Sequence, residues 1–242
     1  MMKINDIKLL LGVFLGAVFS CGALANMSIY PMNVEVGETG ATQIRVMSQS
    51  DAVQFVKVTE KQIINPGTPQ EKEVSVEGFA KNSLVITPQK LAISAGSQRL
   101  VRLVAVELPA TETTWRVYFE GVPELEDSAA AATQQTPTTK VGISLVWGAL
   151  VHVAPKTVVA SLRLDTQRGL VINDGTLRMP LREVGVCDLA GVCHWQKETA
   201  TIYPGTELKV ASLMVKSGKK YKVRYYHWLK KAIEEIDLPI NS

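Results

Sequence analysis

Residues 141–153 read Val-Gly-Ile-Ser-Leu-Val-Trp-Gly-Ala-Leu-Val-His-Val, and this stretch decides the fold. Side chains alternate between the two faces of a strand, so one face would carry only apolar residues: Val141, Ile143, Leu145, Trp147, Ala149, Val151 and Val153. The other face would carry the smaller or more polar set of Gly142, Ser144, Val146, Gly148, Leu150 and His152. One face of this predicted strand therefore requires much more burial than the other.

The residues just before the strand, 123–139, are mostly polar or small. They contain too little apolar area to order themselves, so we predict an irregular loop that leaves the start of the strand without cover. Two interpretations follow. The strand is either the last core strand of its own domain, which explains Val151 and Val153 well, or its first half is available to another protein.

The N-terminus predicts export from the cytoplasm. Lys3 and Lys8 precede the apolar stretch 9–19, and Ala23-Leu24-Ala25 fits a cleavage site, so we expect a signal peptide over 1–25 that is cleaved after Ala25. Cys21 suggests a lipoprotein as an alternative, which the fit of the Ala-Leu-Ala site disfavours. No later window reaches the roughly 18 apolar residues of a membrane span, so we expect no membrane insertion.

Cys187 and Cys193 are the only two cysteines that remain after such cleavage. In an oxidising compartment we expect them to form a disulfide that joins two neighbouring strands across a short loop. His194 lies beside Cys193, but two cysteines and one histidine at this spacing match no known metal site, so we predict no metal.

Length and charge limit the partners. Cleavage would leave 217 residues, enough for two domains, and removal of Lys3, Lys8 and Asp6 lowers the formal net charge from +3 to +2, which is too small to indicate nucleic acid. A basic cluster near the C-terminus fits a solvated hairpin face: Lys216, Lys219, Lys220, Lys222, Arg224, Lys230 and Lys231.

Short apolar or alternating runs between turn residues predict strands almost throughout. In the first half the expected strands are 27–36, 42–47, 53–58, 62–64, 73–76, 84–86, 98–106, 114–122 and 141–153. In the second half they are 161–164, 169–172, 180–186, 194–203, 208–214 and 220–228. We predict an all-β chain of two immunoglobulin-like sandwiches, 26–155 and 156–242, while residues 230–242 fit either a short helix or a last strand.

Motifs of catalysis are missing from the sequence. It has no Gly-rich phosphate loop, no Gly-x-Ser-x-Gly elbow and no His-Glu-x-x-His helix. We therefore predict no catalytic residues and no cofactor, and we expect a binding protein instead of an enzyme.

Two exported sandwiches with a loop leading into a bare apolar strand resemble the periplasmic chaperones of the chaperone–usher pilus pathway. The resemblance covers essentially the whole exported chain. Its residues are Val141, Ile143, Leu145 and Pro155, the run Leu84-Val85-Ile86-Thr87-Pro88, the run Ala95-Gly96-Ser97-Gln98-Arg99-Leu100-Val101-Arg102, and the run Trp115-Arg116-Val117-Tyr118-Phe119. It is greatest to the alternate branch that serves fimbriae of the colonisation-factor type.

The resemblance implies a function and a site. Such chaperones complete a pilin that lacks its last strand and deliver it to an outer-membrane usher, and their two sandwiches form an L or boomerang. In this chain the donor strand would present Val141, Ile143, Leu145 and Trp147 to the pilin groove, with Trp147 undecided between the pilin and the home core. An exposed donor strand also predicts self-association of the free chain.

One feature of the family is missing from this chain. Common members hold the pilin's C-terminal carboxylate with an arginine in the first strand and a lysine in the donor strand, where this chain has Met32 and Leu150. We expect the carboxylate to be held elsewhere, and the candidates are Arg116, Lys140 and Arg178, each of which also fits an ordinary surface cation.

Two other functions remain as alternatives. An exported adhesin or glycan-binding module would use the aromatic residues Tyr203, Tyr221, Tyr225, Tyr226 and Trp228, some of which alternate like a core face. A periplasmic metalloenzyme would use His194 and its neighbours.

Overall fold

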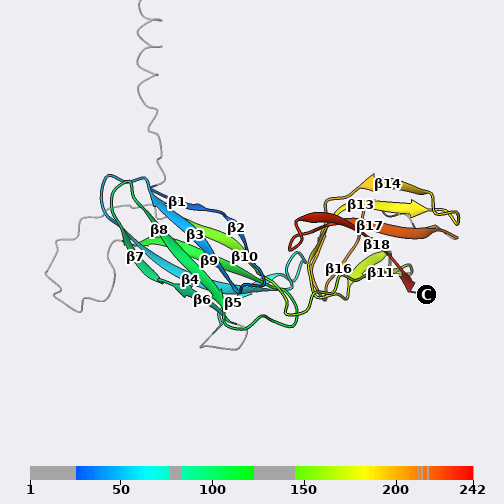
Figure 1. Cartoon of the computed structure of the whole chain (residues 1–242), viewed down its shortest axis with the longest axis horizontal. Coiled ribbons are helices and arrows are strands. Elements are labelled where there is room, and N and C mark those ends of the chain that lie inside the picture. Colours follow the sequence, from blue (N-terminus) through cyan, green and yellow to red (C-terminus); the bar gives the residue numbers. More distant parts are fainter. Residues whose placement is uncertain are drawn as a thin grey trace, which may run out of the picture.

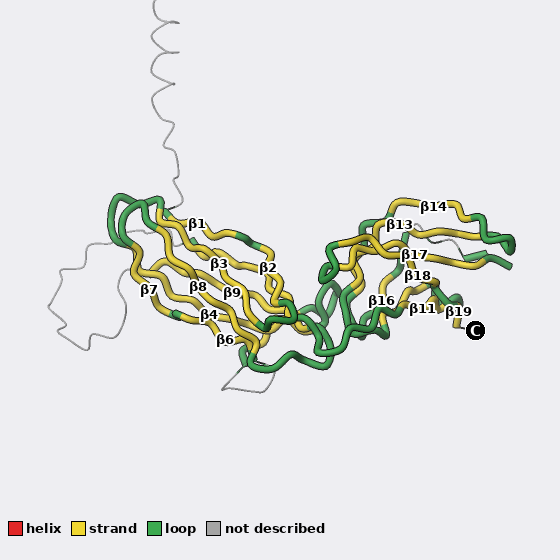
Figure 2. Tube along the Cα trace, in the orientation of Figure 1, coloured by secondary structure: helices red, strands yellow, loops and turns green. Residues whose placement is uncertain are grey.

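The computed structural model describes residues 26–76, 83–122, 145–211, 213, 215–216 and 218–241, and every regular element in these ranges is a β-strand. The predicted signal peptide, the loop 123–139 and residues 140–144 lie outside the described residues. No helix in the described ranges is long and apolar enough to cross a membrane. Two β-sandwiches meet at an angle (Figures 1 and 2), which confirms the predicted all-β class and the paired immunoglobulin-like architecture.

The first sandwich is built from two sheets. One contains, in spatial order, β1 (Met27–Tyr30), β3 (Ala41–Ser48), β8 (Gln98–Ala105) and β6 (Leu84–Thr87). The other contains β2 (Asn33–Val36), β10 (Val146–Val153), β9 (Thr113–Val122), β4 (Gln54–Ile64) and β5 (Lys72–Val74), and β7 (Lys90–Ile93) also pairs with β4. Alternate side chains of both sheets fill the core, among them Ile44, Val46, Val56, Val101, Leu103, Val117 and Phe119.

Three strands of the first sandwich differ from the sequence prediction. The expected single strand 27–36 is divided into β1 and β2, which belong to different sheets, and Pro31 between them has no backbone N–H to continue a ladder. The segments 53–58 and 62–64 form one long strand, β4, and β7 was not predicted. The expected hairpin is present, because Gln62 pairs with Val74 of β5.

The second sandwich also has two sheets. One contains β16 (Glu207–Leu208), β12 (Leu170–Asn173), β11 (Leu162–Asp165) and β19 (Ile240–Asn241). The other contains β14 (Cys193–Lys197), β13 (Met179–Cys187), β17 (Lys220–His227) and β18 (Ala232–Asp237), and β15 (Thr201–Ile202) also pairs with β13. The C-terminal tail is therefore strand, not helix, as far as Asn241.

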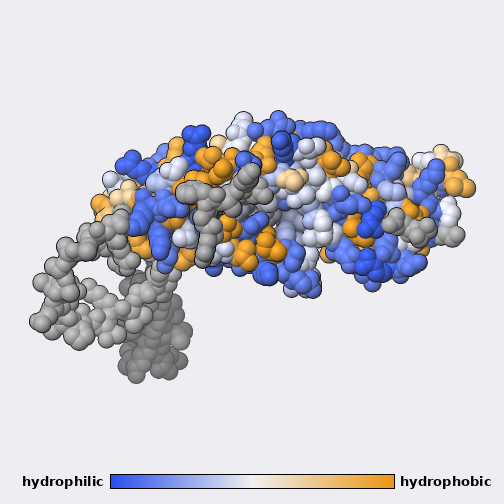
Figure 3. All heavy atoms as spheres, turned by 90° about the horizontal axis from the view of Figure 1, so that it is seen from below, coloured by the Kyte–Doolittle hydropathy of each residue, from blue (hydrophilic) through white to orange (hydrophobic). Residues whose placement is uncertain are grey.

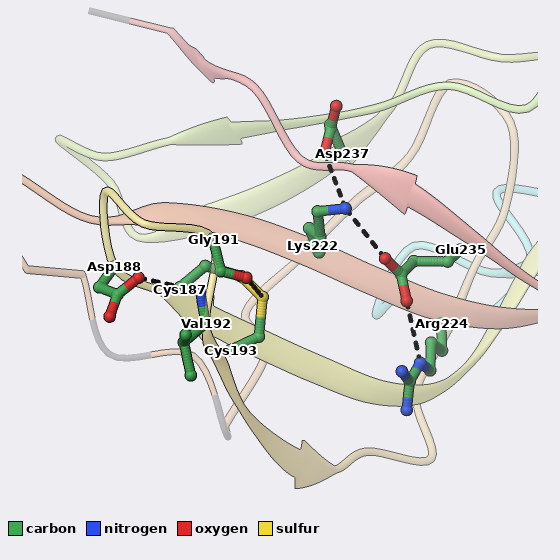
Figure 4. The surroundings of a disulfide bond; sticks show 9 residues. All are labelled: Cys187, Asp188, Gly191, Val192, Cys193, Lys222, Arg224, Glu235 and Asp237. Carbon is green, nitrogen blue, oxygen red and sulfur yellow. Dashed lines mark hydrogen bonds and ion pairs between the residues drawn. A yellow bond between two sulfur atoms is a disulfide. The ribbon is translucent and has the colours of Figure 1, made fainter.

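The predicted disulfide is present at the tip of the β13–β14 hairpin, away from the first sandwich (Figures 1 and 4). Cys187 and Cys193 are direct register partners, and their Cα atoms lie 3.9 Å apart. On the neighbouring β17–β18 hairpin, Lys222 and Arg224 both form ion pairs with Glu235. These cations are paired within their own hairpin, as expected of a solvated face.

A buried carboxylate, that of Glu112, joins the two sandwiches. Glu112 lies in the loop before β9, and its oxygens accept hydrogen bonds from Arg178 Nη1 at 2.5 Å, from the Arg178 backbone N–H at 2.9 Å and from Trp228 Nε1 at 3.1 Å. His152 Nδ1 of β10 lies 3.4 Å from the same carboxylate. Burial alone would raise the pKa of Glu112, but His152 and Arg178 together hold it below its usual value. The carboxylate therefore stays charged at neutral pH.

The β4–β5 hairpin makes a second contact between the sandwiches. Its turn contains Gly67, whose φ of +73° is in the left-handed region. A Cβ at Gly67 would lie 3.1 Å from the ring of Tyr203 in the second sandwich, so glycine permits this close approach. Lys231 adds an ion pair across the joint to Glu35 of β2. Several independent contacts therefore hold the two sandwiches together.

Loss of the disulfide should destabilise the second sandwich without unfolding it. Closing so short a loop restricts the unfolded chain by about 2–3 kcal/mol, so replacing Cys187 and Cys193 with serine should lower the free energy of unfolding by about that amount. Urea denaturation measures the difference. The unaltered chain in reducing agent is the control and should match the variant, and equal stability of oxidised and serine forms would contradict the prediction.

Removal of the joint carboxylate should be much more damaging than removal of the whole ion pair. Glu112→Leu leaves the Arg178 guanidinium buried without its main partner, which should cost about 3–5 kcal/mol in urea denaturation. The double variant Glu112→Leu/Arg178→Met leaves no such charge and should recover a large part of that loss. A double variant less stable than the single one would refute this account of the joint.

Candidate functional site

Strand β10 has an open edge over its first half. It pairs with β9 along its whole length, but with β2 only over Leu150–Val153. The Leu150 backbone N–H donates to the carbonyl of Met32 at 2.8 Å, where this second pairing begins. Between Val146 and Ala149, no strand of the described chain pairs with the other edge. The backbone there can accept an added strand.

Burial changes sharply along the same strand. Ala149, Val151 and Val153 are buried in the core of the first sandwich, and Trp147 is partly buried against it. Leu145, two residues before Trp147, is 47% exposed, and Val146 on the opposite face is 48% exposed. Trp147 therefore packs with the home core, while the apolar surface begins at Leu145. Val141 and Ile143 lie outside the described residues.

The outer face of the sheet beside this edge carries two cations. Arg116 of β9 is the register partner of Leu150 on one side and of Lys61 of β4 on the other. Gly148 makes room for Arg116, because a Cβ there would lie 3.4 Å from the Arg116 side chain and 3.4 Å from the Tyr118 ring. Lys61 Nζ lies 5.9 Å from the centre of that ring. The cations are thus held next to the donor strand.

One carboxylate of the chain approaches these cations. Glu73 of β5 places Oε1 3.2 Å from Arg116 Nε, and the Tyr118 hydroxyl lies 2.7 Å from each Glu73 oxygen. Burial, and then this hydrogen bond, raise the pKa of Tyr118 above its usual value. Two cations and one carboxylate leave the group formed by Lys61, Glu73, Arg116 and Tyr118 with one positive charge at neutral pH.

The three predicted carboxylate anchors have different positions. Arg116 is on this outer face and partly exposed, and Lys140 lies outside the described residues. Arg178 is buried in the joint, where it pairs with Glu112 and with Glu35. Its charge is already matched by two carboxylates, which argues against Arg178 as an anchor for a further one.

Sequence reasoning missed Lys61 and Glu73. Both belong to the β4–β5 hairpin, which the turn at 66–69 predicted without indicating a role. Lys61 is 55 positions from Arg116 along the chain, yet the two are direct register partners. The alternation of Lys57, Thr59 and Lys61 could have indicated a polar outer face, but not which strand lies beside it.

The aromatic site required by the adhesin alternative is not formed. Tyr221, Tyr225 and Trp228 are almost completely buried, the first two in the core of the second sandwich and Trp228 in the joint. They cannot form a platform for a sugar in this fold. No three side chains of His, Cys, Asp or Glu in the described ranges cluster closely enough to hold a metal ion, so the His194 alternative has no further support.

The chain is similar to known fimbrial proteins, although no protein-family model matches it. It is 30% identical over 189 residues to a CFA/I fimbrial protein of Escherichia coli, covering 75% of this chain and 78% of the relative. It is 31% identical over 192 residues to a CS1 fimbrial protein of Escherichia coli, covering 76% and 79%.

Two solved structures have the same architecture. The class 5 fimbriae chaperone CfaA matches with a TM-score of 0.71 at 25% identity, over 88% of this chain and 99% of CfaA. A chain in the structure of a chaperone–tip adhesin complex of CFA/I fimbriae biogenesis matches with a TM-score of 0.69 at 25% identity, again over 88% and 99%. Sequence relatives and structural neighbours thus agree, and the chain belongs to the fimbrial chaperones of the chaperone–usher pathway, in the class 5 or colonisation-factor branch.

Proposed function

We propose that this chaperone binds fimbrial subunits by adding the first half of its donor strand to their open sheet edge. The single observation that carries the proposal is the unpaired edge of β10 from Val146 to Ala149, which continues from an exposed Leu145. The related chain in the chaperone–tip adhesin complex supports a partner that is itself a pilin or an adhesin.

Two kinds of contact would hold the pilin. Backbone hydrogen bonds would pair the open edge of β10 with a pilin strand, and Val141, Ile143 and Leu145 would fill the groove that the missing strand of the pilin leaves. Each buried aliphatic side chain contributes about 1.5–3 kcal/mol, from which the cost of ordering residues 123–145 is subtracted. The complex would be stable, yet a better-fitting strand of the next pilin could replace the chaperone without any nucleotide.

Arg116, with Lys61 beside it, would bind the C-terminal carboxylate of the pilin. Arg116 is the register partner of Leu150, the residue that replaces the lysine of common family members. The positive charge would therefore lie on the next strand instead of on the donor strand itself. Arg116 suits this role because guanidinium and carboxylate can form two parallel hydrogen bonds.

The remaining features of the proposal concern location and assembly. Fimbrial chaperones are periplasmic and are not enzymes, and the N-terminal sequence supports export with cleavage after Ala25. The loaded chaperone would deliver its pilin to the outer-membrane usher. The free chain would cover its donor strand by self-association, and the boundary between the two domains would lie at Pro155. Exposed apolar residues occur among polar ones on the face drawn in Figure 3, so exposure alone does not mark the site.

Substitution of Leu145 should abolish pilin binding, while substitution of its neighbour should not. Leu145→Glu places a charge in the pilin groove, so recovery of the co-expressed cognate pilin from the periplasm should fall at least about tenfold. Val146→Glu is the matched control, because Val146 is equally exposed but points to the opposite face. Equal recovery with Leu145→Glu and the unaltered chain would reject the donor-strand assignment.

Substitution of Arg116 should weaken the complex without disturbing the fold. Loss of a charge-assisted hydrogen bond to a carboxylate should raise the dissociation constant of the chaperone–pilin complex about tenfold or more, measured with purified proteins. Arg45→Ala removes an exposed cation from the other sheet and should change the constant little. If both variants bind equally well, the carboxylate is held by another residue.

A further inference from the structure

Glu73 brings a carboxylate of this chain to the cation that we propose as the anchor. Its Oε1 lies 3.2 Å from Arg116 Nε, and its two oxygens are both 2.7 Å from the Tyr118 hydroxyl. The C-terminus of a pilin would bring the same chemical group to the same place. In the free chain, Glu73 therefore already makes the interaction that the ligand would make.

The contact between Glu73 and Arg116 is close but incomplete. Nε of Arg116 is itself buried, yet it has no hydrogen-bond acceptor within the described part of the chain, since the geometry to Glu73 is that of an ion pair only. The Arg116 side chain as a whole is 38% exposed. Partly exposed ion pairs of this kind are weak, so a carboxylate with better geometry can replace Glu73.

The surroundings keep the cation in place when its partner changes. The Arg116 side chain packs across Gly148, and the Tyr118 ring packs beside it on the same glycine. Glu73 is held by β5, which pairs with the end of β4 next to Lys61. The cationic side chain is fixed by packing on the donor strand, whereas Glu73 comes from a three-residue strand at the edge of the sheet.

We infer that, given the anchoring role proposed for Arg116, Glu73 is an internal competitor that the C-terminal carboxylate of the pilin must displace. The competition makes Glu73 a specificity-determining residue. A free carboxylate such as acetate has only its charge with which to displace Glu73. A C-terminus that ends a strand paired with β10 also has its backbone hydrogen bonds and apolar side chains. Arg116 is thereby reserved for carboxylates that arrive on a strand.

The test uses the mature chain and a fluorescent strand peptide of alternating Val and Thr residues, made once with a free C-terminal carboxylate and once with an amide. Binding is measured by fluorescence anisotropy. Glu73→Gln keeps the size of the side chain and removes its charge, so it should tighten binding of the free-acid peptide about two- to fivefold. Binding of the amide peptide should not change.

Two further variants complete the experiment. Glu120→Gln removes the same charge from the same face of β9, two residues beyond Tyr118, and should leave both affinities unchanged. Arg116→Ala should remove the preference for the free acid over the amide. Thermal unfolding of each variant verifies that it is folded.

The possible failures are distinguishable. If the unaltered chain binds both peptides equally, the anchoring role of Arg116 fails, and the role of Glu73 fails with it. If Arg116→Ala removes the acid preference but Glu73→Gln does not tighten acid binding, the anchor stands and the competition is rejected. If Glu73→Gln tightens both peptides equally, Glu73 acts on the shape of the site and not on its charge, which also overturns the inference.

Discussion

The buried carboxylate of Glu112 is the interaction on which the arrangement of this molecule depends. It lies in the loop that enters β9, accepts hydrogen bonds from Arg178 and Trp228 of the second sandwich, and contacts His152 on β10. A buried charge without partners costs several kcal/mol, so these elements cannot separate independently. Burial lowers the pKa of His152 below its usual value, although the hydrogen bond to Glu112 opposes this, so the imidazole is neutral at neutral pH and Arg178 supplies the positive charge of the pair. The end of β10 is thereby fixed at the joint between the sandwiches.

With its end fixed, β10 can present its start to another protein without loss of the home fold. The core of the first sandwich needs Ala149, Val151 and Val153, all of which precede the joint directly and are buried. It does not need Leu145 or the residues before it, because Trp147 is the first side chain of the described strand that packs against that core. One strand can therefore serve two proteins, with the division between Leu145 and Trp147. An added partner strand is held by a few apolar side chains and backbone hydrogen bonds, which suits a complex that must later be exchanged.

The charged face next to the donor strand shows how a binding role can move between neighbouring strands. Common members of the family carry their cations on the first strand and the donor strand, but this chain has Met32 and Leu150 there. Its cations are Arg116 and Lys61, one and two strands further across the same sheet. Neighbouring strands are about 5 Å apart, so a long arginine side chain on β9 can reach across the donor strand. Gly148 on the donor strand supplies the space for it.

Local chemistry determined much of this protein. Strand alternation, turn residues, the two cysteines and the N-terminal apolar stretch are properties of short segments, and from them the all-β class, the two sandwiches and the disulfide could be predicted. The sequence also indicated the apolar face of 141–153 and the possible importance of Arg116. It could not indicate that Pro31 divides the first strand between two sheets, that Arg178 is buried beside Glu112, or that Glu73 and Lys61 meet Arg116. Those facts depend on which strands pair and in which register, and pairing between residues more than 40 positions apart is decided only when the sheets form and pack.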